Sequence, residues 1–412
     1  MSELIYPHVL LLSYYSNGDR QYPPNLQVDD LSSLISLDKY EVKGYRIKQS
    51  LNNINSLFLI CALQTEEIPP DYDRFYTLTK QLLTARELEE KTEKDTERKI
   101  GQKIGQTLIL IGYLPPFVTF NQENCQKAAQ SAYENLGQIK AQTWSSPQKA
   151  EKFGAQVFSL GETPIAAQTD SEKIEHILIF IYRDRAAIDA IGDYYQDWLQ
   201  LYCYYHLIVS SYRETRAIKA DIKNYYSPAL VFIENPNYPK ALIECTLEQL
   251  EKAISESALQ SSQYTEGISS LETRKAAIET NLDNYTKQLK KFSETDKFSE
   301  IFNRHYLPQI KQDITTLTPG LRLHETWVNT LRGMVEIQRA KSDRDIEASI
   351  GAAGVGAGVS SAVASATSAL VKDFETDWSP AQNLTVVLSV SLLCGLGLGL
   401  LTFYLLKKRR SR

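Results

Sequence analysis

A stripe of small side chains near the carboxyl end has the spacing of one helix face. Glycines and serines recur there at intervals of 4, 3, 4 and 3 residues, which in a helix places them in one line. Small residues let helices approach closely, and serine hydroxyls can face water. The stripe therefore predicts either helix packing or the lining of a polar conduit. It consists of Gly354, Gly358, Ser361, Ser365 and Ser368.

Acidic residues gather at two places where their carboxylates could attract cations. One group directly follows the stripe and would raise the local concentration of cations at its end. The other group forms acidic pairs in residues 71–90, where we favour a solvated helix face over a divalent ion site. The first group is Asp373, Glu375 and Asp377, and the second is Asp71, Asp73, Glu87, Glu89 and Glu90.

Catalytic signatures are missing from the sequence. The segment GQKIGQT at 101–107 lacks the Gly-Lys-Ser/Thr ending of a phosphate loop, and neither HExxH nor GxSxG occurs. The histidines lie in separate predicted elements without paired ligand spacing, and the five cysteines form no CxxC pair. We therefore expect no enzymatic activity and no resident cofactor.

Composition and charge restrict the class of protein further. With 43% hydrophobic and 23% charged residues, the 412-residue chain has the composition of a protein with a buried core. Its net charge is −5, whereas a protein that binds duplex nucleic acid concentrates Lys and Arg on one face. Nucleic acid is therefore not an expected partner.

The carboxyl-terminal region predicts two membrane crossings. Residues 384–406 are uncharged and, at about 1.5 Å per residue, long enough to cross a hydrocarbon layer of roughly 30 Å. The basic tail at 407–412 and the acidic other flank predict a cytoplasmic carboxyl end. Because the amino-terminal part shows no export signal, we expect an even number of crossings. The uncharged run 349–371 is then the first, although its large apolar residues favour insertion by only about 2 to 4 kcal/mol.

Long helices are predicted between these crossings and the amino-terminal part. A heptad repeat occupies 247–292, with apolar residues at most of its core positions. The polar stretch 290–297 predicts a turn after which the next helix folds back antiparallel. Thr318-Pro319-Gly320 predicts the start of a further helix that leads into the first crossing. Packing within one chain and a coiled coil between chains both remain open explanations of the repeat.

The amino-terminal part predicts an α/β domain. Apolar runs typical of buried strands alternate there with helical patterns. A long helix follows, and its aromatic stripe is more typical of a core or an interface than of a ligand site. The runs are 8–15, 56–63, 106–114 and 176–183, the helical patterns lie near 73–96 and 122–136, and the stripe is Ile188, Ile191, Tyr195, Trp198, Tyr202, Tyr205, Val209 and Tyr212.

The order of these parts resembles the CorA-type two-transmembrane divalent metal-ion transporters. The likeness covers a cytosolic α/β domain in 1–227, a long α-helical hairpin and stalk in 228–348, and a two-helix transmembrane hairpin with a basic tail in 349–412. That family carries Gly-Met-Asn at the outer end of its first span. This chain reads Ala369-Leu370-Val371-Lys372-Asp373 there, and its one Gly-Met pair, Gly333-Met334, lies in the stalk.

The resemblance implies an oligomeric membrane channel or transporter for cations, gated through the stalk helix by the cytosolic domain. It implies a homopentamer in the cell (inner) membrane, with two crossings and both ends in the cytoplasm. Mg²⁺ or another divalent cation is then the transported or regulatory ion, and the partners are membrane lipid and further copies of the chain. The missing motif leaves a second hypothesis open, a membrane-anchored effector or scaffold whose α/β domain senses a ligand or a protein.

Overall fold

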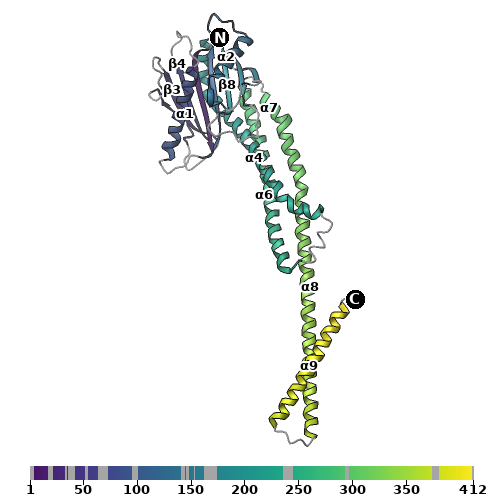
Figure 1. Ribbon diagram of the computed structural model, residues 1–412. Coiled ribbons are helices and arrows are strands. Elements are labelled where there is room, and N and C mark those ends of the chain that lie inside the picture. Colours follow the sequence, from purple (N-terminus) through teal and green to yellow (C-terminus); the bar gives the residue numbers. More distant parts are fainter. Residues whose placement is uncertain are drawn as a thin grey trace. The chain divides into compact units, whose positions relative to one another are not determined.

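The fold is described from a computed structural model of the chain (Figure 1). The chain divides into two compact units, one formed by Met1–Asn224 with Thr265–Pro319 and the other by Tyr225–Tyr264 with Gly320–Arg412. The three-segment division predicted from the sequence stays a prediction. The described residues are 4–16, 22–32, 35, 42–51, 54–63, 73–94, 101–140, 144, 148–152, 154–161, 174–234, 245–292, 297–373 and 380–410.

The first unit contains an eight-stranded sheet among its described residues, in the order β2-β3-β4-β1-β5-β8-β7-β6. Neighbouring strands are antiparallel, except that β5 and β8 run parallel. The predicted α/β domain is therefore confirmed as a mixed sheet with helices. The strands are β1 Ile5–Ser16, β2 Gln27–Asp30, β3 Val42–Leu51, β4 Ile54–Leu63, β5 Lys103–Tyr113, β6 Gln148–Lys152, β7 Ala155–Leu160 and β8 His176–Tyr182.

Helices cover both faces of this sheet, which explains why its central strands are apolar at nearly every position. Successive side chains of a strand point to opposite faces, so Leu11 and Leu12 of β1 belong to two different cores. The core with Leu11 includes residues of α1 (Asp73–Lys94) and α2 (Gln122–Glu134). The core with Leu12 includes the aromatic residues of α4 (Tyr195–Glu234).

The predicted aromatic stripe is part of the core, but its first residues do not belong to the long helix. A short helix α3 (Arg185–Asp189) and a 3₁₀ turn η2 (Ala190–Tyr194) come before α4. Asp184 caps α3, because its side chain accepts a hydrogen bond from the amide of Ala187. The expected single helix from Ile188 onward was therefore wrong, while the expected core role is confirmed for Trp198, Tyr202, Tyr205, Val209 and Tyr212.

The predicted fold-back of the stalk is confirmed within each unit. Helix α6 (Leu247–Lys290) is followed by α7 (Lys297–Ile301), a π-helical turn η3 (Phe302–Tyr306) and α8 (Leu307–Asp373). In the first unit Glu279 of α6 pairs with Lys311 of α8, and in the second Ser257 pairs with Trp327 and Cys245 with Gln338. Positions that rise along α8 meet positions that fall along α6, so the two helices are antiparallel. The heptads therefore pack within the chain.

The helix start predicted at Thr318-Pro319-Gly320 was wrong, because α8 continues through Pro319. Proline removes one backbone donor and usually kinks a helix. Here the hydroxyl of Thr318 donates to the carbonyl of Ile314, 2.7 Å away, so Thr318 acts inside the helix and not as a cap. Side chains of α8 are buried on both sides of the proline, for example Ile310 in the first unit and Leu331 in the second.

Candidate functional site

The carboxyl-terminal helix α9 (Pro380–Arg410) contains the predicted apolar segment. Among the described residues, Leu384–Tyr404 is the one helical stretch long and apolar enough to cross a membrane. Its large side chains are exposed in the single chain, for example Leu393 and Leu400 at 69% and 68%. By length and composition α9 therefore suits a membrane.

A narrow line of α9 is buried within the same unit. Val387, Ser391 and Gly395 lie four residues apart and are all buried, although most of the helix is exposed. The hydroxyl of Ser391 donates to the carbonyl of Val387, 2.6 Å away, which satisfies it inside the helix. A face of small, satisfied side chains is suited to close packing against another helix.

The stripe of glycines and serines lies on α8, as predicted. Gly354, Gly358, Ser361 and Ser365 are helical and exposed in the single chain, whereas the side chain of Ser368 lies outside the described part. A Cβ added at either glycine would meet no other atom within 4 Å. Glycine in a helix interior is less favourable than alanine by about 0.8–1 kcal/mol, and contacts among the described residues do not explain these two glycines.

The serine hydroxyls of the stripe are already hydrogen-bonded inside the helix. Ser361 donates to the carbonyl of Gly358 at 2.8 Å, and Ser365 donates to that of Ser361 at 2.9 Å. Each oxygen retains lone pairs that can accept from water or contact a cation. Of the three acidic residues expected at the outer mouth, Asp373 ends α8 with its side chain outside the described part, and Glu375 and Asp377 lie outside the described residues.

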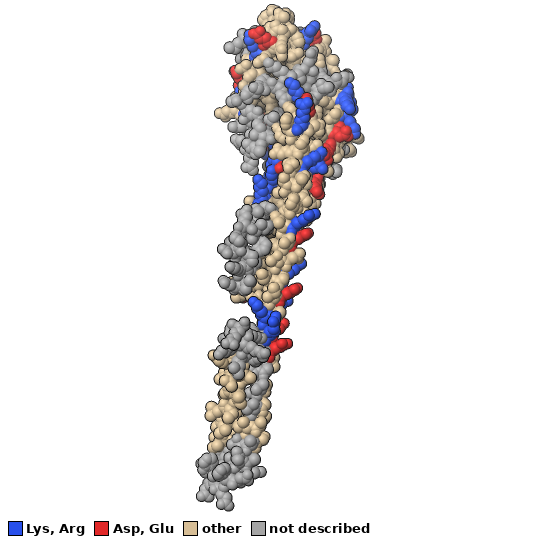
Figure 2. All heavy atoms as spheres, turned by 90° about the vertical axis from the view of Figure 1, so that its right-hand side faces the viewer, with Lys and Arg blue, Asp and Glu red and all other residues tan. Residues whose placement is uncertain are grey.

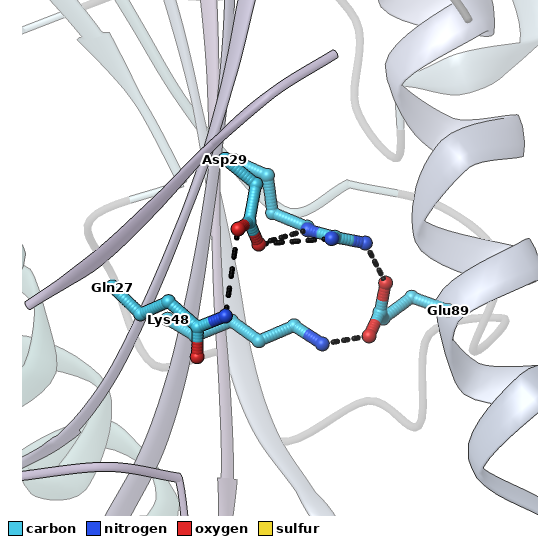
Figure 3. Close-up of polar contacts among 5 residues, drawn as sticks. Gln27, Asp29, Lys48 and Glu89 are labelled. Carbon is cyan, nitrogen blue, oxygen red and sulfur yellow. Dashed lines mark hydrogen bonds and ion pairs between the residues drawn. The ribbon is translucent and has the colours of Figure 1, made fainter.

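Glu89 of α1 takes part in ion pairs of the sheet domain (Figure 3). The carboxylate of Glu89 accepts from Arg46 Nη1 at 2.6 Å and is also paired with Lys48, and both cations lie on β3. Arg46 donates from Nε and Nη2 to Asp29 of β2, at 3.1 and 2.9 Å, and this contact lowers the pKa of the Asp29 carboxyl. The cluster fastens α1 to β3 and, through Arg46, to the edge strand β2, and it leaves Glu89 engaged with cations of the protein.

The neighbouring Glu90 is engaged in the same way. Its carboxylate accepts from the hydroxyl of Tyr15 at 2.7 Å and lies 3.5 Å from Nε of the buried Arg86. Asp71 is outside the described residues, and so is the side chain of Asp73. Within the described part of the chain, no group of three or more His, Cys, Asp or Glu residues is arranged to hold a metal ion.

A buried contact between two histidines was missed from the sequence. Thr107 Oγ1 of β5 lies 2.9 Å from Nδ1 of His176 and 2.7 Å from Nε2 of His206, which are residues of β8 and α4. Burial first, and then the nearby His176 and Arg213, lower the pKa of His206 well below its ordinary value. Gly105 leaves room for this ring, because a Cβ there would lie 2.1 Å from Nδ1 of His206.

This contact also explains the segment GQKIGQT. Its residues from Lys103 onward form strand β5, so the segment is not a phosphate-binding loop. Gly105 and Thr107 serve the packing of His206 against the sheet. A hydroxyl can donate to one ring nitrogen and accept from another, so Thr107 links His176 of β8 to His206 of α4.

Charged residues on the face shown in Figure 2 carry both signs side by side. Pairs such as Lys287 with Asp283 and Arg339 with Glu251 place opposite charges next to each other along the helices. Over the described residues of this face, no large area of a single sign is visible. On this face the charges of the described residues are therefore typical of solvated helices.

No protein-family model, curated protein or solved structure matches the chain. The likeness to CorA-type transporters accordingly rests on the arrangement of its own elements. The sheet domain, the long helices and the apolar α9 are the elements that any functional proposal has to use.

Proposed function

We propose that the chain forms an oligomeric cation channel or transporter of the CorA-like kind, whose cytosolic sheet domain acts on the membrane segment through α8. The observation that carries the proposal is the continuity of α8 from Leu307, next to the sheet domain's core, to Asp373 beyond the small-residue stripe. A helix without a break can transmit a tilt or a rotation along its length.

The stripe supports a role in an oligomer. Gly354 and Gly358 weaken the helix and make no contact in the single chain that requires glycine. Close approach of a further copy would account for them, and the exposed Ser361 and Ser365 would then offer hydroxyl oxygens to a water-filled axis. We propose that 349–371 is a first crossing, which α9 follows as the second.

The charges at the ends of these segments support the two-crossing arrangement. Arg339, Lys341 and Arg344 precede the first segment, and Lys407–Arg410 follow the second. Basic residues accumulate on the cytoplasmic side of spans, so this pattern favours one side for both outer ends. The acidic loop at 373–377 would then lie on the opposite side.

Flux measurements on purified protein in proteoliposomes test the proposal. We expect passage of Mg²⁺, Co²⁺ or K⁺, read with ion-sensitive dyes inside the vesicles. Ser361→Leu together with Ser365→Leu should reduce flux at least tenfold, because two large apolar side chains would replace the polar lining. The matched control is Ala362→Leu, an exposed position on the adjacent face of α8. Absence of flux from a verified oligomer would contradict the proposal.

A second function is favoured by one observation: among the described residues, only α9 meets the length and apolarity of a span. A membrane-anchored effector or scaffold needs no more than this one anchor. Cysteine introduced by Asp377→Cys, in a background without the native cysteines, separates the two functions. Labelling from outside supports two crossings, whereas labelling only from the cytoplasmic side supports the single anchor.

A further inference from the structure

His324 occupies an unusual place in the packing of α8 against α6. Its side chain is 1% exposed, and its ring lies 4.9 Å from that of Tyr264 on α6. One turn further along α8, Trp327 donates from Nε1 to Ser257 Oγ at 2.9 Å, and Leu331 and Leu250 continue the contact between the helices. The histidine is therefore enclosed between the two helices, beside the Ser257–Trp327 hydrogen bond and the apolar contacts that follow it.

Neither ring nitrogen of His324 has a hydrogen-bond partner within the described part of the chain. Buried polar atoms are almost always paired, so an exception needs an explanation. Burial is the cause that lowers the pKa of this imidazole, which keeps it neutral at pH 7. Among the described residues, the titratable Tyr264 lies against the ring, and the charged neighbours on α8, Arg322 and Glu325, are exposed to solvent.

We propose that His324 is a proton-sensitive joint between α6 and α8, which holds the two helices together when neutral and loosens them when protonated. The imidazolium would place a charge between the two helices, where neither ring nitrogen has a partner among the described residues. The charge is accommodated only when the ring reaches water, and that requires α8 to separate from Tyr264 and Ser257. The inference does not depend on whether the chain conducts ions.

Protonation of His324 favours the separated helices, because the solvated ring binds a proton more tightly than the buried ring does. The open, solvated histidine has an ordinary pKa of about 6.5, so lowering the pH from 7.5 to 5 increases the population of the open state by at most about 30-fold. The effect is local, because only contacts between these two helices are broken. His305, which is also on a helix but exposed, should show no such coupling.

Amide hydrogen exchange of the full-length protein in detergent micelles tests the proposal. Peptides that cover 250–264 and 320–335 should lose protection on going from pH 7.5 to 5, after correction for intrinsic exchange rates. His324→Gln should remove this pH dependence, because an amide does not titrate. The matched control His305→Gln should retain it.

Two results would overturn the proposal. One is unchanged protection of both peptides in the wild-type protein between the two pH values. The other is an equal loss of protection in wild type and His324→Gln. If His324→Gln is already unprotected at pH 7.5, His324→Phe replaces it, because an apolar ring fills the same space without a proton to bind, and the same two results decide.

Discussion

The sheet domain and the carboxyl-terminal part of α8 with α9 use the same residue types for different reasons. In the sheet domain Gly105 is required by the His206 ring, and Trp198 is fully buried against Phe180. In the other region Gly354 faces open space and Leu400 is 68% exposed. The residues of the first region are explained by contacts within the chain, whereas the described residues make no contacts that explain those of the second.

The largest expected effect is the loss of a core aromatic residue. Trp198→Ala should lower the free energy of unfolding of the sheet domain by about 3–5 kcal/mol, because it leaves a cavity beside Phe180. Leu400→Ala should change it by less than about 0.5 kcal/mol. Urea unfolding in detergent, followed by near-ultraviolet circular dichroism, measures both. An equal loss of unfolding free energy in the two variants would contradict the expectation that Trp198 is stabilised by contacts within the chain and Leu400 is not.

Acidification should destabilise the sheet domain through its buried histidines. His8 Nδ1 donates to the carbonyl of Tyr6, and burial lowers its pKa from 6.5 to about 4. The unfolded chain binds a proton in this window that the folded chain does not, so stability falls as the pH drops from about 6.5 to 4, by at most roughly 3 kcal/mol for His8. His206 acts in the same direction.

A pH series of urea unfolding curves checks this expectation. His8→Gln should flatten the stability profile between pH 6.5 and 4, because its amide does not titrate. A profile as steep as that of the wild type would assign the acid sensitivity to other groups, such as His206.

A buried carboxylate on α8 should have an effect of intermediate size. Asp313 is 6% exposed, and its carboxylate accepts a hydrogen bond from Lys219 Nζ at 2.6 Å. Its other oxygen forms an ion pair with Arg216 Nη1 at 2.7 Å, without the alignment of a hydrogen bond. Asp313→Ala leaves two cations without their partner, and because both are partly exposed we expect a loss of about 2–3 kcal/mol. Glu256→Ala, which breaks an exposed pair with Lys252, should change stability by less than about 0.5 kcal/mol.

The two glycines give the smallest and most direct comparison. Gly105→Ala should destabilise the sheet domain by about 2 kcal/mol, because the new methyl group overlaps the buried His206 ring. Gly354→Ala should stabilise the helical conformation of α8 in the monomer by about 0.8–1 kcal/mol, since no neighbouring atom opposes the methyl group there. Thermal unfolding measures the first. If Gly354→Ala also weakens self-association on native gels, the glycine serves contact with another copy.

The sequence predicted those parts of the fold whose signal is local. The uniformly apolar β1, β4, β5 and β8 were recognised, because strands buried on both faces leave continuous apolar runs. Strand β3 was missed, since it alternates residues such as Lys43 and Arg46 with apolar ones, and so were the short β2, β6 and β7. Pro319 was taken as a helix start because its packing on both sides is not visible in the local pattern.

The candidate sites were predicted less completely, for a physical reason. The stripe on α8 was found because its residues are close in sequence and share one helix face. The pairings of Glu89 with Arg46 and of His176 with His206 depend on how strands and helices pack together in space. The spacing of these residues in the sequence does not predict them. His324 offered no sequence signal either, because only the three-dimensional packing removes its partners.

Pro319 makes α8 easier to bend at one position than a helix without proline would be. Without an amide proton at this position, the carbonyl four residues earlier lacks its usual helical partner, so bending there sacrifices one hydrogen bond fewer than elsewhere. The division between the two compact units on α8 falls at this same residue. We therefore expect α8 to bend more readily at Pro319 than at other positions along the helix.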